Sequence, residues 1–158
     1  KELGLGEETG VVLSPDVGSA KMSQSYAKKL NVGFALIDKR RPKRNKAEVA
    51  NLVGELIGKD VLIIDDMIDT AGTICNAAET AIKQGASSVI AVGTHAVLSG
   101  ESINRLMSSS INKVIVCDTI DIPKDKQFDK LEIISVGHVF AEAIKHVTDG
   151  TSLSSMFS

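Results

Sequence analysis

The sequence predicts an α/β fold in which a parallel β-sheet is flanked by helices on both faces. Short runs of branched apolar residues alternate with stretches of helical spacing along the whole chain. The run at 61–64 has four consecutive branched apolar residues, which is typical of a central strand covered on both faces. With 158 residues, 43% of them hydrophobic, the chain is long enough for one compact domain with a real core.

Each expected strand is a short apolar run bounded by a turn residue or a polar residue. The first run closes at Pro15, and the second ends at Asp38. The stretch 49–57 fits either a half-exposed strand pair or one arm of a hairpin. The other strands are expected at residues 11–14, 34–37, 61–64, 89–92, 114–116 and 131–136.

Helical spacing of apolar side chains predicts the elements between these strands. Residues 21–30 show this spacing, and the amphipathic stretch 74–84 ends at Gly85, a common helix-terminating residue. Further helices are expected at 101–107 and 139–147. The rest of the chain consists of a basic loop at 39–46, a polar loop at 118–130 and a Ser-rich tail at 151–158.

Composition argues against several classes of protein. The balance of 18 basic and 20 acidic residues argues against a nucleic-acid partner. No apolar stretch approaches the length of a membrane span, and the N-terminal residues lack a signal-peptide core. Cys75 and Cys117 lie far apart without metal-ligand spacing, which favours reduced, buried thiols. We therefore expect a cytoplasmic protein without nucleic-acid or membrane partners.

Polar residues stand where the predicted strands end. The carboxyl ends of parallel strands meet at one edge of a sheet, and ligands bind in the crevice outside that edge. Several polar residues that meet at this edge indicate a ligand site more strongly than any one of them does alone. The residues expected on it are Asp16, Asp38, Asp65, Asp66, Thr94 and Asp118.

The most informative part of this rim is the segment 61–73, VLIIDDMIDTAGT. Asp65 and Asp66 follow the central strand directly, and two ionised carboxylates so close together repel each other. Such a pair is tolerable where it faces sugar hydroxyls, which donate hydrogen bonds, or a divalent cation, which needs oxygen ligands. The tandem acids therefore indicate a ligand site.

The turn at 70–73 adds a second feature. Its Thr-Ala-Gly-Thr sequence presents successive backbone N–H groups and two hydroxyls at a helix start, and Gly72 permits close approach of a ligand. This arrangement holds a phosphate dianion without a lysine. Together with the acids it predicts a site for a phosphorylated sugar. The structural alternative is that Asp69 or Thr70 caps the helix and the tandem acids cap a loop.

The segment 61–73 resembles the phosphoribosyl pyrophosphate signature of proteins with the type I phosphoribosyltransferase fold. Four other segments narrow this resemblance: SPDVG at 14–18, IDKRRP at 37–42, THAVLSG at 94–100 and SLSSMF at 152–157. In this order they resemble the carboxyl-terminal half of the ribose-phosphate diphosphokinases, or phosphoribosyl pyrophosphate synthetases. The resemblance extends from residue 11 to residue 158.

The resemblance implies an activity and a division of roles. The family transfers the diphosphoryl group of MgATP to ribose 5-phosphate, giving phosphoribosyl pyrophosphate and AMP for nucleotide biosynthesis. It implies Mg²⁺ as cofactor, bound in part by Asp16, whose turn faces the pyrophosphate. The family usually has paired glycines in that turn, where this chain has Ser19 as the second. Binding of ribose 5-phosphate would fall to Asp65, Asp66, Asp69, Thr70, Ala71, Gly72 and Thr73.

The basic loop matches the flexible loop of the same family. Lys39 and Arg41 correspond to the pair that stabilises the transferred diphosphoryl group, and Arg41 also binds substrate. As the anomeric hydroxyl attacks the β-phosphorus of ATP, negative charge grows on the phosphoryl oxygens, and mobile cations that close on this charge lower the barrier. Arg41 can bind two phosphate oxygens at once. Without the resemblance, a solvated basic loop is the simpler interpretation.

The Ser-rich tail resembles a segment that lines a regulatory phosphate or nucleotide-diphosphate site between subunits in this family. Ser152, Ser154 and Phe157 match its pattern, whereas Ser155 replaces an aromatic residue found in many members. The alternative is a frayed terminus.

Residues 1–158 are expected to form a single phosphoribosyltransferase-like domain, the carboxyl-terminal half of a longer two-domain enzyme that forms a homo-oligomer. In the family the amino-terminal half recognises adenine, so this chain alone is expected to turn over poorly or not at all. One alternative is a phosphoribosyltransferase, although no aromatic-rich segment offers to stack a base. Another is a non-catalytic regulatory subunit, against which Lys39, Arg41, Asp16 and the tandem acids argue.

Overall fold

The protein folds around one mixed β-sheet. The computed structural model describes residues 5–40 and 49–157, without the side chains at 39, 40, 49, 50 and 157. Within this part of the chain the sheet has seven strands in the order β3-β2-β1-β4-β5-β6-β7. The strands are β1 (Gly10–Ser14), β2 (Gly33–Arg40), β3 (Val49–Val53), β4 (Asp60–Ile68), β5 (Ser88–Ala96), β6 (Lys113–Cys117) and β7 (Leu131–Ile134).

All strand pairs are parallel except the one at the β3 edge. There β3 runs antiparallel to β2, with Arg40 opposite Val49 and Leu36 opposite Val53. The prediction for 49–57 thus resolves to one arm of a hairpin. The reason is chain length, because the eight residues between these strands are fewer than the dozen or more that a parallel crossover needs.

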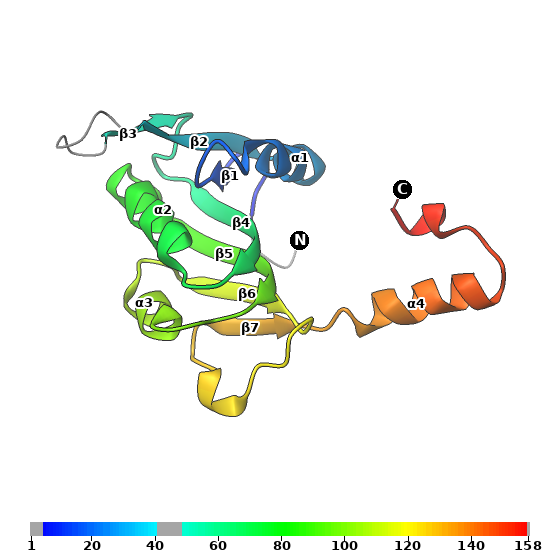
Figure 1. Ribbon diagram of the computed structural model, residues 1–158. Coiled ribbons are helices and arrows are strands. Elements are labelled where there is room, and N and C mark those ends of the chain that lie inside the picture. The colour runs from blue at the N-terminus through cyan, green and yellow to red at the C-terminus, as the bar shows by residue number, and fades with distance from the viewer. Residues whose placement is uncertain (1–4, 41–48, 158) are drawn as a thin grey trace.

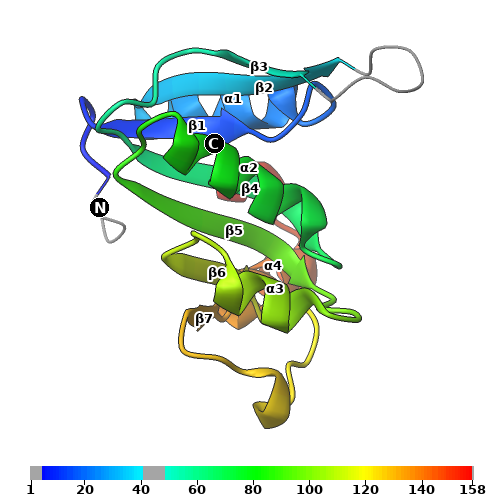
Figure 2. The ribbon, with the colours of Figure 1, turned by 90° about the vertical axis from the view of Figure 1, so that its left-hand side faces the viewer.

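Helices pack on both faces of the sheet, which confirms the predicted fold class. Helix α1 (Ala20–Leu30) lies on one face, and α2 (Gly72–Lys83) and α3 (Ser102–Ser108) lie on the other (Figures 1 and 2). Strand β4 contributes side chains to the core on both faces of the sheet. Leu62 and Ile64 pack in the smaller core cluster with Ala27 of α1, while Val61 and Ile63 belong to the larger cluster with α2. The unbroken apolar run therefore arises because both faces of β4 are buried.

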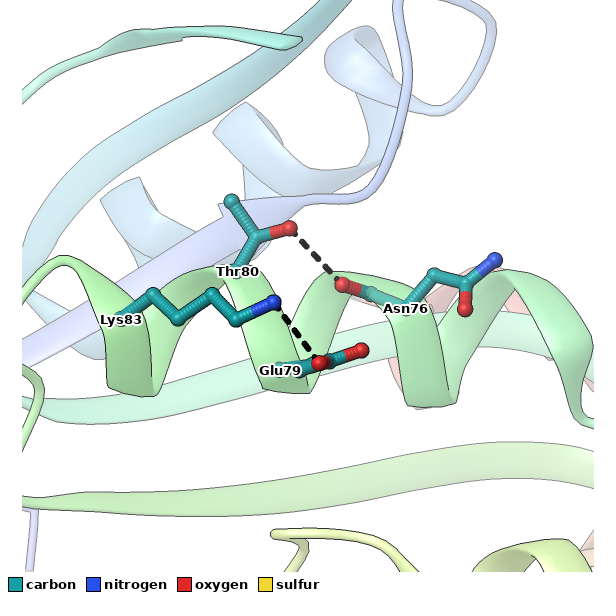
Figure 3. A network of polar contacts seen from close by, with 4 residues as sticks. All are labelled: Asn76, Glu79, Thr80 and Lys83. Atoms are coloured by element: carbon teal, nitrogen blue, oxygen red, sulfur yellow. Dashed lines mark hydrogen bonds and ion pairs between the residues drawn. The ribbon is translucent and has the colours of Figure 1, made fainter. Parts of the chain in front are cut away.

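The outer face of α2 is polar, as its amphipathic spacing predicts. The Thr80 hydroxyl donates to the carbonyl of Asn76 at 2.8 Å, and Lys83 Nζ lies 2.7 Å from Glu79 Oε1 (Figure 3). Both partners of the ion pair are largely exposed, so it contributes only about 0.3–0.5 kcal/mol to stability. Gly85 follows the helix with a φ of +88°, the left-handed conformation that suits glycine at a helix end.

The last helix, α4 (Gly137–Thr148), leaves the sheet instead of covering it. It extends beyond the end of β7 and contacts η2 (Leu153–Phe157), and none of its residues is buried (Figure 1). Phe140, Ile144 and Val147 are each more than 60% exposed. The predicted helix is therefore present, but within the described chain it adds nothing to the core. No described helix is long and apolar enough to cross a membrane.

Candidate functional site

The topology places the candidate site where the strand order reverses. Strand β1 pairs with β2 on one side and with β4 on the other, while β4 continues to β5. The connections from these neighbouring strands thus diverge, which opens a crevice at their carboxyl ends. Asp16 follows β1 by two residues, and Asp65 and Asp66 lie near the end of β4. Segments far apart in the sequence meet here.

The tandem acids lie within the last part of β4, not beyond it. The strand continues to Ile68, four residues further than expected from the apolar run. Asp65 is half-buried and Asp66 is exposed, and the backbone N–H of Asp66 donates to Asp65 Oδ1 at 2.9 Å. Both acids nevertheless border one hollow of about 350 Å³ together with Asp16.

The turn after β1 positions Asp16 through its own hydrogen bonds. The N–H and hydroxyl of Ser19 lie 2.9 and 3.1 Å from Asp16 Oδ1, and the hydroxyl of Ser14 donates to the carbonyl of Asp16 at 2.7 Å. Oδ2 of Asp16 accepts no bond from the described residues. Ser19 has an ordinary φ of −88°, so its backbone does not require glycine. At Gly18 a Cβ atom would lie only 3.2 Å from Asp16 Oδ1.

The acids of this hollow fit a cation that arrives with a substrate. No three metal-binding side chains of the described residues lie close enough to form a complete site. Mg²⁺ typically takes one or two carboxylates and completes its coordination with water and substrate phosphates. Asp16, whose Oδ2 accepts no bond from the described residues, together with Asp65 and Asp66 offers carboxylate oxygens of the kind that bind Mg²⁺.

Asp65 is the acid whose protonation the fold alters. Partial burial raises the pKa of its carboxyl above the usual range, and the side-chain hydrogen bond with Asp66 acts in the same direction. The Asp66 N–H bond lowers the pKa, whereas the negative charges of Asp66 and Asp16 raise it. The ionised form of Asp65 is therefore disfavoured in the ligand-free fold.

This shift makes stability depend on pH. Because the folded pKa exceeds the unfolded one, the carboxyl favours folding below its unfolded pKa, and this contribution is lost as pH rises through the folded pKa. Asp65→Asn is expected to raise the Tm of the ligand-free protein at pH 7, with a smaller gain in acid. Thermal unfolding by circular dichroism across this range measures the effect. Asp125→Asn, at an exposed acid, is the control, and a lower Tm for Asp65→Asn at pH 7 would contradict the assignment.

The turn between β4 and α2 forms a second hollow, of about 130 Å³, lined mainly by residues 69–73. This is smaller than the roughly 300–1,000 Å³ of sites for whole ligands and suits one small group. The backbone N–H groups of Thr70, Ala71, Gly72 and Thr73 have no acceptor among the described residues. Ala71 has a φ of +60°, unusual for a residue with a side chain. The hollow is thus bordered by free hydrogen-bond donors.

The capping alternative does not describe this turn. Ala71 is the N-cap of α2, and no side chain caps the helix. Asp69 instead accepts a hydrogen bond from the hydroxyl of Ser99, which follows β5. On the same side of the turn, an Nη atom of Arg105 in α3 donates to the carbonyl of Thr70. Ser99 belongs to a quoted motif, whereas nothing local in the sequence indicated Arg105.

The two hollows are adjacent because Asp65 borders both. One offers free amides and threonine hydroxyls, and the other offers carboxylates from two strands. A ligand that spans them would place an anionic group in the amide hollow and hydroxyls or a cation beside the acids.

The other expected rim residues lie outside these hollows. Asp38 is on β2, opposite Asn51 of β3. Thr94 and its neighbour His95 are in β5, where the His95 ring bonds to the Thr119 hydroxyl at 2.9 Å. Asp118 accepts the N–H of Val136 at 2.8 Å, and its hydrogen bond with Ser135 is the main cause of its lowered pKa. Asp118 therefore holds the chain just before α4.

Most of the predicted basic loop lies outside the described residues, and the described residues of the tail border neither hollow. Lys39 is in β2, opposite Ala50, so the prediction of a loop from 39 onward is wrong at its start. Its side chain and the whole of Arg41 lie outside the described residues. Among the predicted tail residues, the N–H of Ser154 donates to Ser152 Oγ at 3.2 Å, and Phe157 is the last residue of η2, at the far end of α4 (Figure 1).

Comparisons with known proteins show which proteins this chain is similar to. The chain is 48% identical over its whole length to the ribose-phosphate pyrophosphokinase of Caldanaerobacter subterraneus subsp. tengcongensis, of which it spans 49%. It is also 48% identical to the enzyme of the same name from Fusobacterium nucleatum, of which it spans 50%. The chain therefore spans about half the length of these relatives.

Solved structures show the same fold. Phosphoribosylpyrophosphate synthetase from Mycobacterium smegmatis matches 91% of this chain with a TM-score of 0.83 and 36% identity, over 46% of its own chain. Orotate phosphoribosyltransferase from Aeropyrum pernix matches 85% of this chain and 64% of its own, with a TM-score of 0.55 and 13% identity, a likeness of fold alone.

The sequence model described as the phosphoribosyl synthetase-associated domain matches residues 39–158. This range includes β2 from Lys39 onward, the tandem acids, the turn at 70–73 and the tail. On this match, the chain belongs to the phosphoribosyl synthetase-associated domain family.

Proposed function

We propose that this chain supplies the ribose 5-phosphate site and the cationic loop of a ribose-phosphate diphosphokinase. The observation that carries the proposal is the pair of adjacent hollows at the β1–β4 switch point, one bordered by free amides and the other by acids. The likeness to ribose-phosphate pyrophosphokinases over the whole chain supports the same activity. The reaction transfers the diphosphoryl group of ATP to the anomeric hydroxyl of ribose 5-phosphate, giving phosphoribosyl pyrophosphate and AMP.

In this proposal the phosphate of the substrate occupies the turn at 70–73. Its oxygens accept the backbone N–H groups of Thr70, Ala71, Gly72 and Thr73 and bonds from the two threonine hydroxyls, near the positive end of α2. Asp69 immediately precedes this turn and would help to hold it in shape through its hydrogen bond with Ser99. The ribose then extends toward Asp65 and Asp66, whose carboxylates accept hydrogen bonds from its hydroxyl groups. Ribose hydroxyls would add hydrogen bonds to the Asp65 carboxylate beyond the one that it accepts from the Asp66 N–H, and so favour its ionised form.

The diphosphate end of the reaction faces the turn after β1. Asp16 would bind Mg²⁺ through its free carboxylate oxygen, and Asp65 and Asp66 lie on the same hollow. Bound Mg²⁺ supplies charge neutralisation for the diphosphate. Lys39 and Arg41 would close on the transferred group from the β2 side and stabilise its developing charge. They are the catalytic residues of the proposal.

The proposal extends to partners and setting. ATP and ribose 5-phosphate are the substrates, and the whole protein would be a cytoplasmic homo-oligomer. Because the chain spans about half of its relatives, the ATP pocket would be completed by another part of the protein. Ser152, Ser154 and Phe157 would line a regulatory phosphate site between subunits, which fits their distance from the hollows.

Product analysis tests the proposed function. The full-length protein, with MgATP and ribose 5-phosphate, is expected to form AMP and phosphoribosyl pyrophosphate in equal amounts, because one diphosphoryl transfer yields both. Residues 1–158 alone are expected to bind ribose 5-phosphate weakly and to form little or no product. Phosphorus NMR and nucleotide chromatography follow the products, with ribose as the control substrate.

Three results would contradict this assignment. Consumption of phosphoribosyl pyrophosphate with a base, without AMP formation, would indicate a phosphoribosyltransferase. A full-length protein that forms no product but alters a partner synthetase would indicate a regulatory subunit. Robust ATP-dependent turnover by residues 1–158 alone would overturn the proposed division of roles.

A further inference from the structure

We propose that the segment from Val97 to Arg105, here called the brace, positions the turn at 70–73 for phosphate, with Ser99 and Arg105 as its positioning residues. The inference rests on the proposed function, because it names what holds the phosphate site in shape. The brace follows β5 and enters α3, and it contacts the chain immediately before the turn.

The brace engages the backbone just ahead of the turn. The N–H groups of Val97 and Leu98 both donate to the carbonyl of Ile68 at 3.1 Å, and the N–H of Ser99 donates to the carbonyl of Asp69 at 3.2 Å. The Ser99 hydroxyl also donates to the Asp69 carboxylate. Two successive carbonyls and one side chain are thus held by three consecutive residues.

Arg105 binds the next carbonyl along the chain, that of Thr70. Its Nη1 atom donates to the carbonyl of Thr70 and lies 3.9 Å from where a Cβ atom on Gly72 would stand. Arg105 is itself exposed, so its guanidinium packs into no core. The described hydrogen bond of its guanidinium is with the turn, where it adds a positive charge.

Peptide planarity converts these contacts into an orientation of the donors. In a trans peptide the carbonyl of one residue points opposite to the N–H of the next. The carbonyls of residues 68–70 point toward the brace, so the N–H groups of Asp69, Thr70 and Ala71 point away from it. Those of Thr70 and Ala71 are among the free amides that border the 130 Å³ hollow. The brace therefore sets the direction in which these amides meet a ligand.

Backbone strain on both sides of the contact supports a functional role. Ala71 has a φ of +60° and Leu98 a φ of +48°, a region that costs a residue with a side chain about 1–2 kcal/mol. Such conformations persist where surrounding contacts over-determine them, and they concentrate at ligand sites. Here the strained residue of the turn and the strained residue of the brace lie on the two sides of one hydrogen-bonded contact.

The test measures substrate binding in the full-length protein. Arg105→Met and Ser99→Ala are each expected to weaken ribose 5-phosphate binding by about tenfold to a hundredfold, while the KM for ATP stays the same. Binding of ribose, which has no phosphate, is expected to be unaffected by either change. Arg105→Lys and Ser99→Thr retain one donor each and are expected to recover part of the affinity. Isothermal titration calorimetry and steady-state kinetics provide the measurements.

The control is Lys83→Met, which removes an exposed cation of α2 that pairs with Glu79, away from the turn (Figure 3). It is expected to bind ribose 5-phosphate as the wild type does. Thermal unfolding identifies any variant whose fold is lost. If Arg105→Met is such a variant, the affinity of Arg105→Lys is compared with that of the wild type instead. If the wild type binds ribose 5-phosphate and the variants bind it equally well, the proposed role of the brace is overturned and the proposed function stands. If the wild type binds no ribose 5-phosphate, both are overturned.

Discussion

Replacing Lys39 with alanine in the full-length protein is expected to lower kcat by about 10²- to 10³-fold while leaving the binding of ribose 5-phosphate almost unchanged. The position is on β2, the neighbour of β1, whose following turn holds Asp16. A cation that reaches the transferred group from there stabilises charge that is present mainly in the transition state. Loss of such a group lowers kcat and kcat/KM together, without raising KM.

Rapid-quench measurement of AMP formation, alongside calorimetry with ribose 5-phosphate, separates these two effects. Lys124→Ala is a matched control, because Lys124 is an exposed lysine in the short helix η1 (Lys124–Lys126), away from both hollows. It should behave as the wild type. Unchanged turnover in Lys39→Ala would instead favour the non-catalytic, regulatory reading of the chain.

Asp66→Asn is expected to weaken ribose 5-phosphate binding by about a hundredfold. Asp66 is exposed on the hollow that also contains Asp16 and Asp65, so its charge is available to ribose hydroxyls. Hydrogen bonds to a charged acceptor are worth roughly 1.5–3 kcal/mol each, and asparagine offers one oxygen acceptor without the charge. Asp66→Asn is expected to stabilise the free protein less than Asp65→Asn, because Asp66 is exposed and its loss removes only its repulsion of Asp65.

Calorimetry with ribose 5-phosphate at a fixed Mg²⁺ concentration measures this loss. The matched control is Asp125→Asn, which neutralises an exposed acid of η1. An Asp66 variant that keeps wild-type affinity would remove the tandem acids from the proposed sugar site. The turn at 70–73 would then be the only part of the proposal still supported by binding.

Local sequence patterns predicted most of the elements but not their ends. The apolar run at 61–64 indicated a buried strand, yet β4 continues to Ile68 because pairing with β5 extends beyond the buried core. The same extension places Thr94 within β5 and Lys39 within β2. Strand ends depend on the neighbouring strand as well as on hydrophobicity, so the apolar pattern underestimates their length.

The sequence predicted the residues that would contact a ligand more completely than the residues that hold them in position. Carboxylates after a buried strand and a Thr-Ala-Gly-Thr turn identify themselves by residue type and spacing. Arg105 is an ordinary exposed residue in a predicted helix, and only the packing of α3 beside the turn gives it a contact with Thr70. The free end of α4 was equally unpredictable, because its amphipathic spacing indicates an apolar face without indicating what covers it.

By itself, then, the sequence determined the strand and helix types, the tandem acids and the phosphate-sized turn, since these depend on neighbours along the chain. The tertiary structure alone decided that Asp16 and Asp65 share a hollow, that Ala71 is held at a positive φ, and that the amides of the turn remain free. The physical reason is that these features require hydrogen bonds and strand pairings between segments distant in sequence. Residue type and spacing carry no record of such pairings.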